Sequence, residues 1–382
     1  MWISGMEIYV VKAGDNVDAI AASYGISVEQ LTYDNQLIYP YELAIGQALL
    51  ISTGMREASR AIRVGGYAYP FISRWVLNET LPYLSELYIF SYGFTPQGEL
   101  LFPLWTDEWM IEAAMQYGTK PILTLTPFGP DGKFSNQLIN SVINNPEYTR
   151  NLIDNLLLTM EQKGYRGVDI DFEYILAQDR DAFTAFVGQV SESMRAYGYE
   201  TSVALAPKTS ADQRGLLYEG KDYRAIGEVA DYVLLMTYEW GYTYGPPMAV
   251  APINQVRRVV EYAVTEIPPE KINLGIPNYA YDWPLPFEQG VTAARTINNV
   301  QAVRIAIEQG ASIVFDMLAK SPYFNYIQDG VEHEVWFEDV RSLTAKFDLI
   351  SEFNLRGCSY WQIMQFFRAN WLLLKNQFYI SK

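Results

Sequence analysis

The sharpest pattern of hydrophobic and polar positions along the chain lies in RGVDIDFEYI, residues 166–175. Three acidic residues alternate there with three apolar residues: Asp169, Asp171 and Glu173 with Val168, Ile170 and Phe172. Alternation with a period of two predicts a β-strand whose successive side chains point to opposite faces. The three carboxyl groups therefore share one face of the predicted strand, with neighbours about 6.7 Å apart.

Strand-like and helix-like patterns alternate through most of the chain. The predicted strands are IRVGGYAY (62–69), ELYIFSYGF (86–94), KPILTLTPF (120–128), GVDIDFEYI (167–175), TSVALAP (201–207), DYVLLMTYEW (231–240), INLGIPNYAYDW (272–283) and GCSYWQIM (357–364). Eight strands alternating with helices over about 320 residues predict an α/β protein of the (β/α)8 TIM barrel type. An open doubly wound sheet is the alternative, but no glycine-rich phosphate loop follows the first strand.

Two segments depart from this alternation. Residues 284–335 are too long for one helix and contain two strand-like stretches, so we predict a small insertion between the seventh strand and a helix that begins near Glu338. Residues 6–53 predict a small βααβ domain, and the polar stretch 54–61 predicts a linker to a catalytic domain at 62–382.

Capping signals mark the two helices of the small domain. Asp15 is the predicted N-cap of the first helix and Gly25 its end. Ser27 with Gln30 predicts a capping box at the start of the second.

The amino-acid composition limits the partners and the catalytic groups that the chain can have. A net charge of −16 and a pI near 4.6 argue against a nucleic-acid or anionic-membrane partner. One cysteine and one histidine exclude an internal disulfide framework and a multi-histidine metal site, and they argue against a Ser–His–Asp arrangement. No cleavable signal peptide and no apolar stretch of about 20 residues is found, so we expect neither ordinary export nor a membrane span. Carboxyl groups are the catalytic groups that remain.

The three acids are predicted to lie inside the barrel. Helical patterns at 149–164 and 180–198 would cover the apolar face of the strand, which argues against an amphipathic strand with its acids in water. Burying ionised carboxylates is costly unless they are paired, protonated or functional. Glu173 lies nearest the C-terminal end, where barrel active sites are found. Because neighbouring acids repel, one should hold a proton near neutral pH, which predicts a general acid beside an ionised partner.

Aromatic residues are abundant, with 29 tyrosines and 9 tryptophans. Many fall at the C-terminal ends of the predicted strands: Tyr67, Tyr69, Tyr92, Phe94, Phe128, Tyr238, Trp240, Tyr279, Tyr281, Trp283 and Trp361. Flat apolar rings with polar tips suit the faces of pyranose rings, so we expect a sugar substrate.

The small domain resembles a LysM module over its full length. The matching positions are Gly14-Asp15, Ile20-Ala21, Tyr24, Leu31, Asn35, Leu37, Pro40, Leu43, Gly46-Gln47, Leu49 and Ile51. The resemblance implies binding of glycans that contain N-acetylglucosamine, such as peptidoglycan and chitin. Two loops would hold the acetamide groups: Gly14-Asp15-Asn16 and Ile38-Tyr39-Pro40. The alternative is a degenerate module kept for folding or assembly.

Residues 60–375 resemble glycoside hydrolase family 18. The family's Asp-x-x-Asp-x-Asp-x-Glu signature matches at its last three acids, whereas Arg166 replaces the first Asp. In MTYEW, Tyr238 aligns with the family's Met-x-Tyr-Asp stretch and Glu239 replaces its Asp. LGIPNYAYDW matches the family's strand seven. Trp361 aligns with the family's strand-eight tryptophan, which forms the floor of the substrate-binding site.

The resemblance implies a retaining, substrate-assisted mechanism without cofactor or metal. Glu173 would protonate the leaving oxygen and later activate water, while the substrate's own 2-acetamido oxygen acts as nucleophile. Asp171 would orient the acetamide nitrogen, and Asp169 would share a proton with Asp171. Tyr238 would hydrogen-bond the acetamide oxygen, and Trp361 would stack under the reacting sugar. The other implied substrate-binding residues are Glu239, Tyr67, Tyr92, Asn278 and Tyr281.

A LysM module joined to such a barrel resembles the spore cortex-lytic and sporulation-specific glycosidases. The resemblance implies a spore-associated monomer that cleaves peptidoglycan after N-acetylglucosamine. The alternatives are a chitinase or general cell-wall glucosaminidase, a catalytically inactive, lectin-like glycan-binding protein, or Mg²⁺- or Mn²⁺-dependent phosphoryl chemistry on the three acids.

Overall fold

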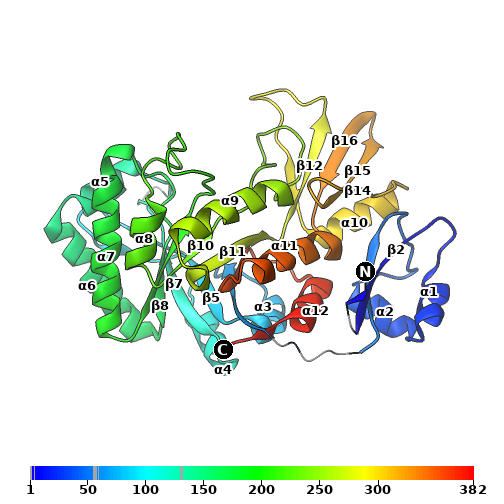
Figure 1. Ribbon diagram of the computed structural model, residues 1–382, viewed down its shortest axis with the longest axis horizontal. Helices are drawn as coiled ribbons and strands as arrows, with labels where there is room; N and C mark the ends of the chain where they lie inside the picture. Colours follow the sequence, from blue (N-terminus) through cyan, green and yellow to red (C-terminus); the bar gives the residue numbers. More distant parts are fainter. Residues whose placement is uncertain (1, 4, 55–57, 59, 130–131) are drawn as a thin grey trace.

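The computed structural model describes residues 2–3, 5–54, 58, 60–129 and 132–382, and it contains a barrel, an inserted sheet and an N-terminal module (Figure 1). The predicted linker, 54–61, is only partly covered, because residues 55–57 and 59 lie outside the described residues. The predicted domain limits 6–53 and 62–382 remain predictions.

Eight parallel strands form the barrel, as the alternation predicted. They are β4 (Ala61–Ala68), β5 (Glu86–Phe94), β7 (Lys120–Leu125), β8 (Gly167–Ile170), β9 (Glu200–Leu205), β10 (Tyr232–Leu235), β11 (Ile272–Pro277) and β17 (Gly357–Trp361). Strand β4 pairs with β5 on one side and with β17 on the other, so the sheet closes on itself. Two short strands, β6 (Leu100–Leu101) and β18 (Tyr379–Ile380), pair with β5 and β4.

Helices surround the barrel (Figure 1). They are α3 (Arg74–Thr80), α4 (Glu108–Gln116), α5 (Asn136–Ile143), α6 (Pro146–Lys163), α7 (Arg180–Ala196), α8 (Tyr223–Val229), α9 (Ile253–Glu266), α11 (Val340–Glu352) and α12 (Arg368–Gln377), with 3-10 turns at Leu81–Tyr83, Ala177–Asp179 and Pro269–Lys271. None of the helices that the structure describes has the length and apolar character needed to cross a bilayer.

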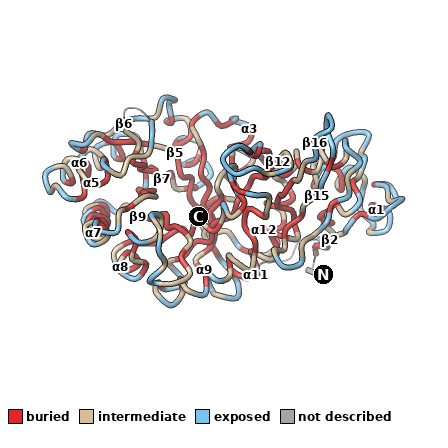
Figure 2. Tube along the Cα trace, turned by 90° about the horizontal axis from the view of Figure 1, so that it is seen from above, coloured by how far each residue is buried: buried red, intermediate tan, exposed pale blue. Residues whose placement is uncertain are grey.

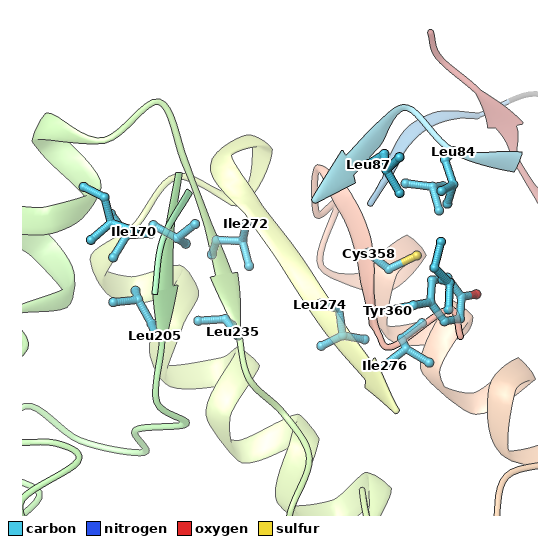
Figure 3. Packing of buried hydrophobic residues seen from close by; sticks show 14 of the residues in the cluster. Leu84, Leu87, Ile170, Leu205, Leu235, Ile272, Leu274, Ile276, Cys358 and Tyr360 are labelled. Carbon is cyan, nitrogen blue, oxygen red and sulfur yellow. The ribbon is translucent and has the colours of Figure 1, made fainter. Parts of the chain in front are cut away.

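The main core lies between the outer face of the strands and these helices, and Figure 2 shows its buried residues inside an exposed shell. Figure 3 shows this packing around Ile170, Leu205 and Leu235 on three strands of the barrel. Phe172 continues the apolar face of β8, and its ring stacks on Phe186 of α7 at 5.7 Å between centroids. The apolar members of the alternating segment therefore face the helices, which leaves the opposite face for the acids.

The seventh predicted strand, 272–283, is wrong as a single element. Strand β11 ends at Pro277, and β12 (Ala280–Leu285) belongs to a separate antiparallel sheet. That sheet also contains β13 (Arg295–Ile297), β14 (Val314–Asp316), β15 (Ser321–Gln328) and β16 (Val331–Trp336), with helix α10 (Asn299–Glu308) between β13 and β14. The inserted sheet thus begins at residue 280, before the predicted 284.

The N-terminal module contains β1 (Trp2–Ile3), β2 (Met6–Val10), α1 (Val17–Tyr24), α2 (Val28–Asp34) and β3 (Ala48–Ser52), so β1 is added to the predicted βααβ order. Asn16, not Asp15, caps α1, because the Asp15 carboxylate accepts from the Lys12 N–H and the Tyr9 hydroxyl instead.

The other capping predictions fare differently. Gly25 ends α1 as predicted. Ser27 caps α2, but Gln30 donates to the Ser52 carbonyl, so the reciprocal half of the predicted capping box is absent.

Candidate active site

Asp169 lies at the centre of the barrel, on β8. Its side chain has 0% exposure and accepts hydrogen bonds from the Tyr67 hydroxyl at 2.7 Å and the Ser202 hydroxyl at 2.6 Å. Burial raises the pKa of Asp169 to about 6, and the two hydrogen bonds act in the opposite direction. Tyr67 comes from β4 and Ser202 from β9, so this carboxyl group is fixed by strands on two sides of the barrel.

The predicted strand 167–175 is too long, because β8 ends at Ile170, so Asp171 and Glu173 lie in the segment that follows β8. Asp171 is buried, and its Oδ1 atom has no hydrogen-bond partner among the described residues. Burial raises the pKa of Asp171, and the negative charges of Glu173 and Asp169 raise it further. Glu173 is partly exposed, and burial raises its pKa as well. The charge of each carboxylate in this group disfavours ionisation of Asp171, and Glu173 is the one that reaches solvent.

Lys221 faces these acids and was missed by the sequence analysis. It is fully buried, and its Nζ donates to the Ala204 carbonyl at 3.4 Å. Its positive charge lowers the pKa of both Asp171 and Glu173, while burial lowers the pKa of Lys221 itself to about 8. A buried ammonium group thus partly balances the buried acids.

Tyr238 and Glu239 follow β10 at the same end of the barrel. Burial raises the pKa of Tyr238, and the charges of Asp171 and Glu173 add to this effect, so the hydroxyl remains a hydrogen-bond donor. Glu239 accepts from the hydroxyls of Tyr279 at 2.5 Å and Tyr281 at 2.9 Å. Its φ of +66° is rare for a non-glycine residue, and such backbone strain concentrates at functional sites.

Trp361, at the end of β17, is surrounded by aromatic rings. Its ring centroid lies 5.0 Å from Phe90, 5.6 Å from Tyr67 and 6.2 Å from Tyr69. Because Tyr67 also holds Asp169, the rings and the acids form one connected site.

Two predicted substrate-binding residues have other partners. Tyr92 is completely buried beneath the helices and donates to Asp107. A register shift between Ile89 and Tyr92 breaks the alternation of β5 and turns Tyr92 to the outer face. The side-chain amide of Asn278 donates to the carbonyls of Gln362 and Gln365, both at 3.0 Å, so it holds the loop after Trp361.

The two remaining predicted substrate-binding positions are tyrosines whose hydroxyls contact acidic residues. Tyr281 and Tyr67 are nearly buried and hold Glu239 and Asp169 through their hydroxyls, so they position acids.

Among the residues that the structure describes, no group of three His, Cys, Asp or Glu side chains is arranged to hold a metal ion. The geometry is that of a proton-transfer site built on carboxyl groups and covered by aromatic rings.

Comparison with known proteins identifies the family. Residues 123–365 match Glycosyl hydrolases family 18. The cortical fragment-lytic enzyme of Bacillus subtilis is 37% identical, over 99% of each chain. The chain belongs to glycosyl hydrolase family 18.

Solved structures of other proteins have the same fold. The crystal structure of the Bacillus cereus spore cortex-lytic enzyme SleL superposes with a TM-score of 0.94 at 33% identity, covering 99% of both chains. A chitinase from Chromobacterium violaceum has a TM-score of 0.75 at 23% identity, over 82% of this chain and 98% of that one, which shows the shared fold.

The family 18 barrel carries a LysM domain, matched at residues 9–52. In the loop predicted to bind glycans, Gly14 has a φ of +86°, and the side chains of Asp15 and Asn16 make local hydrogen bonds. Ile38, Tyr39 and Pro40, the second predicted loop, are all exposed. The second loop is therefore free to contact a ligand.

Proposed function

We propose that this family 18 glycosidase hydrolyses the glycan strands of spore cortex peptidoglycan after N-acetylglucosamine, by a retaining, substrate-assisted mechanism. The names of its relatives, a cortical fragment-lytic enzyme and a spore cortex-lytic enzyme, support the substrate and a spore-associated role. The LysM domain supports binding of a glycan that contains N-acetylglucosamine.

The observation that carries the mechanism is the pairing of Asp171 with Glu173. Asp171 presents a buried Oδ1 that has no donor among the described residues, which is the acceptor that an acetamide N–H requires. Glu173, partly exposed and with a raised pKa, can hold the proton that the leaving glycosidic oxygen needs.

The proposed reaction proceeds in two steps. Glu173 gives its proton to the glycosidic oxygen as the substrate's acetamide oxygen attacks C1, so the C1–O bond breaks and an oxazolinium ring forms. Asp171 accepts the hydrogen bond of the acetamide nitrogen and stabilises the positive charge. Glu173 then takes a proton from water, which attacks C1, opens the ring and restores the starting configuration.

This chemistry restricts the bond that is cut. The sugar on the non-reducing side must carry a free acetamide, and muramic-δ-lactam lacks one because its nitrogen lies in a ring. We therefore expect new reducing ends at N-acetylglucosamine.

Hydrolysis of cortex fragments, followed by mass spectrometry of the products, tests the proposal. Glu173→Gln should lower kcat by about 10²–10⁴-fold while glycan binding persists, because the proton donor is lost and the shape is kept. Glu332→Gln, an exposed change on β16, is the matched control and should have no effect. Muramic reducing ends, or equal cleavage of sugars without acetyl groups, would overturn the mechanism.

A further inference from the structure

The loop between β9 and α8 packs directly against the segment that carries Glu173. Figure 1 shows α8 beside α7, the helix that follows this segment. A Cβ atom at Gly220 would lie 2.2 Å from the Ile175 carbonyl oxygen, so the two backbones touch there and only glycine fits. Two residues further along the loop, Asp222 forms an ion pair with Arg180. The loop and the Glu173 segment are therefore joined on both sides of residue 221.

Lys221 is the residue between these two contacts. It is completely buried although its side chain ends in an ammonium group. In the described part of the chain, its Nζ donates to the Ala204 carbonyl alone, at 3.4 Å, which is longer than the usual N–H···O distance of about 2.7–3.2 Å. An ammonium group has three donors, so this buried cation can form further hydrogen bonds.

The acids of the active site balance the buried charge of Lys221. Burial lowers the pKa of Lys221 to about 8, and the negative charges of Asp171 and Glu173 act in the opposite direction. In return, burial raises the pKa of Glu173, and the charge of Lys221 lowers it. Lys221 is therefore close enough to act on both acids, yet it is hydrogen-bonded to neither of them in this structure.

A second buried lysine holds the Lys221 backbone in place. Lys208 is 2% exposed, and its Nζ donates to the Lys221 carbonyl at 3.0 Å and to the Ala211 carbonyl at 3.3 Å. The Lys208 N–H in turn donates to the Tyr223 hydroxyl at 3.0 Å. The two lysines thus have different roles: Lys208 fixes the loop, and Lys221 presents its charge to the acids.

We propose that Lys221 is a positioning residue for Glu173, whose carboxylate accepts a hydrogen bond from the Lys221 ammonium once Glu173 has protonated the glycosidic oxygen. Lys221 keeps its own three protons in this step, and only the proton of Glu173 moves. Because the ammonium stabilises the ionised acid, Glu173 releases its proton more readily. The inference rests on the proposed function in that Glu173 is the proposed acid.

A double-mutant cycle with Glu173→Gln tests whether Lys221 acts through Glu173. We would measure kcat/KM on cortex fragments, which reports the steps up to cleavage of the glycosidic bond, at a pH where Glu173 is protonated. Lys221→Met should lower kcat/KM about tenfold in the parent, because Glu173 becomes a weaker acid. In Glu173→Gln, which has no proton to give, the same change should lower kcat/KM less than about twofold.

Further variants separate the charge from the fold. Lys221→Gln removes the charge but keeps an N–H donor, so it should behave like Lys221→Met, and thermal unfolding checks that both variants fold. Lys208→Met should lower kcat/KM by a smaller factor, about threefold, because the loop is no longer fixed. Lys271→Met is the matched control, since Lys271 also donates to two backbone carbonyls but precedes β11, at the opposite end of the barrel from Glu173; it should leave kcat/KM unchanged.

Equal factors for Lys221→Met in the two backgrounds would overturn the inference, because Lys221 would then act through Asp171 or through the fold. An unchanged kcat/KM in the parent would overturn it as well. Failure of the proposed function would show in Glu173→Gln alone, which would then hydrolyse cortex fragments like the parent.

Discussion

Asp169, Asp171 and Glu173 place three carboxyl groups close together, and each is stabilised differently. Asp169 receives two hydroxyl donors, Asp171 has an oxygen with no hydrogen-bond partner in the described part of the chain, and Glu173 reaches solvent. The positive charge of Lys221 acts on Asp171 and Glu173. Because their hydrogen bonds and exposure differ, the three carboxyl groups can have different chemical roles.

Lys221→Met should shift the pH dependence of hydrolysis. Glu173 must be protonated to act as an acid, so activity falls as pH rises through its pKa. The Lys221 charge lowers that pKa, and its removal should therefore move the alkaline limb of the kcat profile to higher pH. Lys271→Met, which removes only donors to the carbonyls of Gly227 and Ala230, should leave the limb in place. A downward shift for Lys221→Met would contradict this account.

Sequence reasoning located the acids but not their surroundings. Alternation with a period of two is local, so it sufficed to put Asp169, Asp171 and Glu173 on one face. Lys221 carries no such signal, because its neighbours in LYEGKDY follow no strand or helix period and its burial depends on contacts distant in sequence. Tyr92 was misplaced because a local register shift cannot be read from the strand's composition.

At the scale of elements, the two faces of β8 have different functions: one packs against the helices, and the other carries Asp169 into the barrel. Its outward residues pack under the helices, and Phe172, two residues beyond the end of β8, packs between rings of β5 and α7: Phe94, Phe183 and Phe186. Because Phe172 lies directly between Asp171 and Glu173 in the chain, its packing holds the backbone of the two acids that we propose to be catalytic. The stability of the core and the geometry of the site are therefore linked through one segment.

Phe172→Ala should destabilise the protein by about 3–5 kcal/mol, because it removes a fully buried ring and leaves a cavity. Urea unfolding followed by circular dichroism measures the shift. Phe71→Ala, at a ring that is 57% exposed, should cost about 0.5 kcal/mol or less. Equal shifts for the two variants would mean that the Phe172 ring adds little to the core.

Most barrel elements could be predicted, and the exception is instructive. Segments such as 180–198 and 253–267 carry a strong helical period, and α7 and α9 occupy them. The segment 272–283 is mostly apolar and shows no clear break in its pattern, so β11 could not be separated from β12. Their division depends on pairing with β17 on one side and β16 on the other, which is information from distant parts of the chain.

At the scale of the whole molecule, module and barrel share their cores. Met6 and Leu50 of the module belong to the main barrel cluster, and Ala44 belongs to the cluster of the inserted sheet. Gly46 approaches the barrel's insertion closely, since a Cβ atom there would lie 1.9 Å from the Ile313 carbonyl oxygen.

Gly46→Ala should destabilise the docked module more than Gly25→Ala does. Both residues have positive φ, which costs an L-residue about 1–2 kcal/mol, but an added Cβ at Gly25 meets no atom within 4 Å. Calorimetry should therefore show a larger fall in the unfolding temperature for Gly46→Ala. Equal falls would indicate that the contact with Ile313 yields easily.

The docked arrangement also sets a length scale. A module on a free tether would reach a polymer over distances governed by its linker. Here folded contacts fix the distance between the module and Glu173. Under the proposed function, a glycan strand bound by the module is therefore cut at a set distance from it. Fragments released from long strands would then have preferred lengths, which are determined by the distance between the module and the active site.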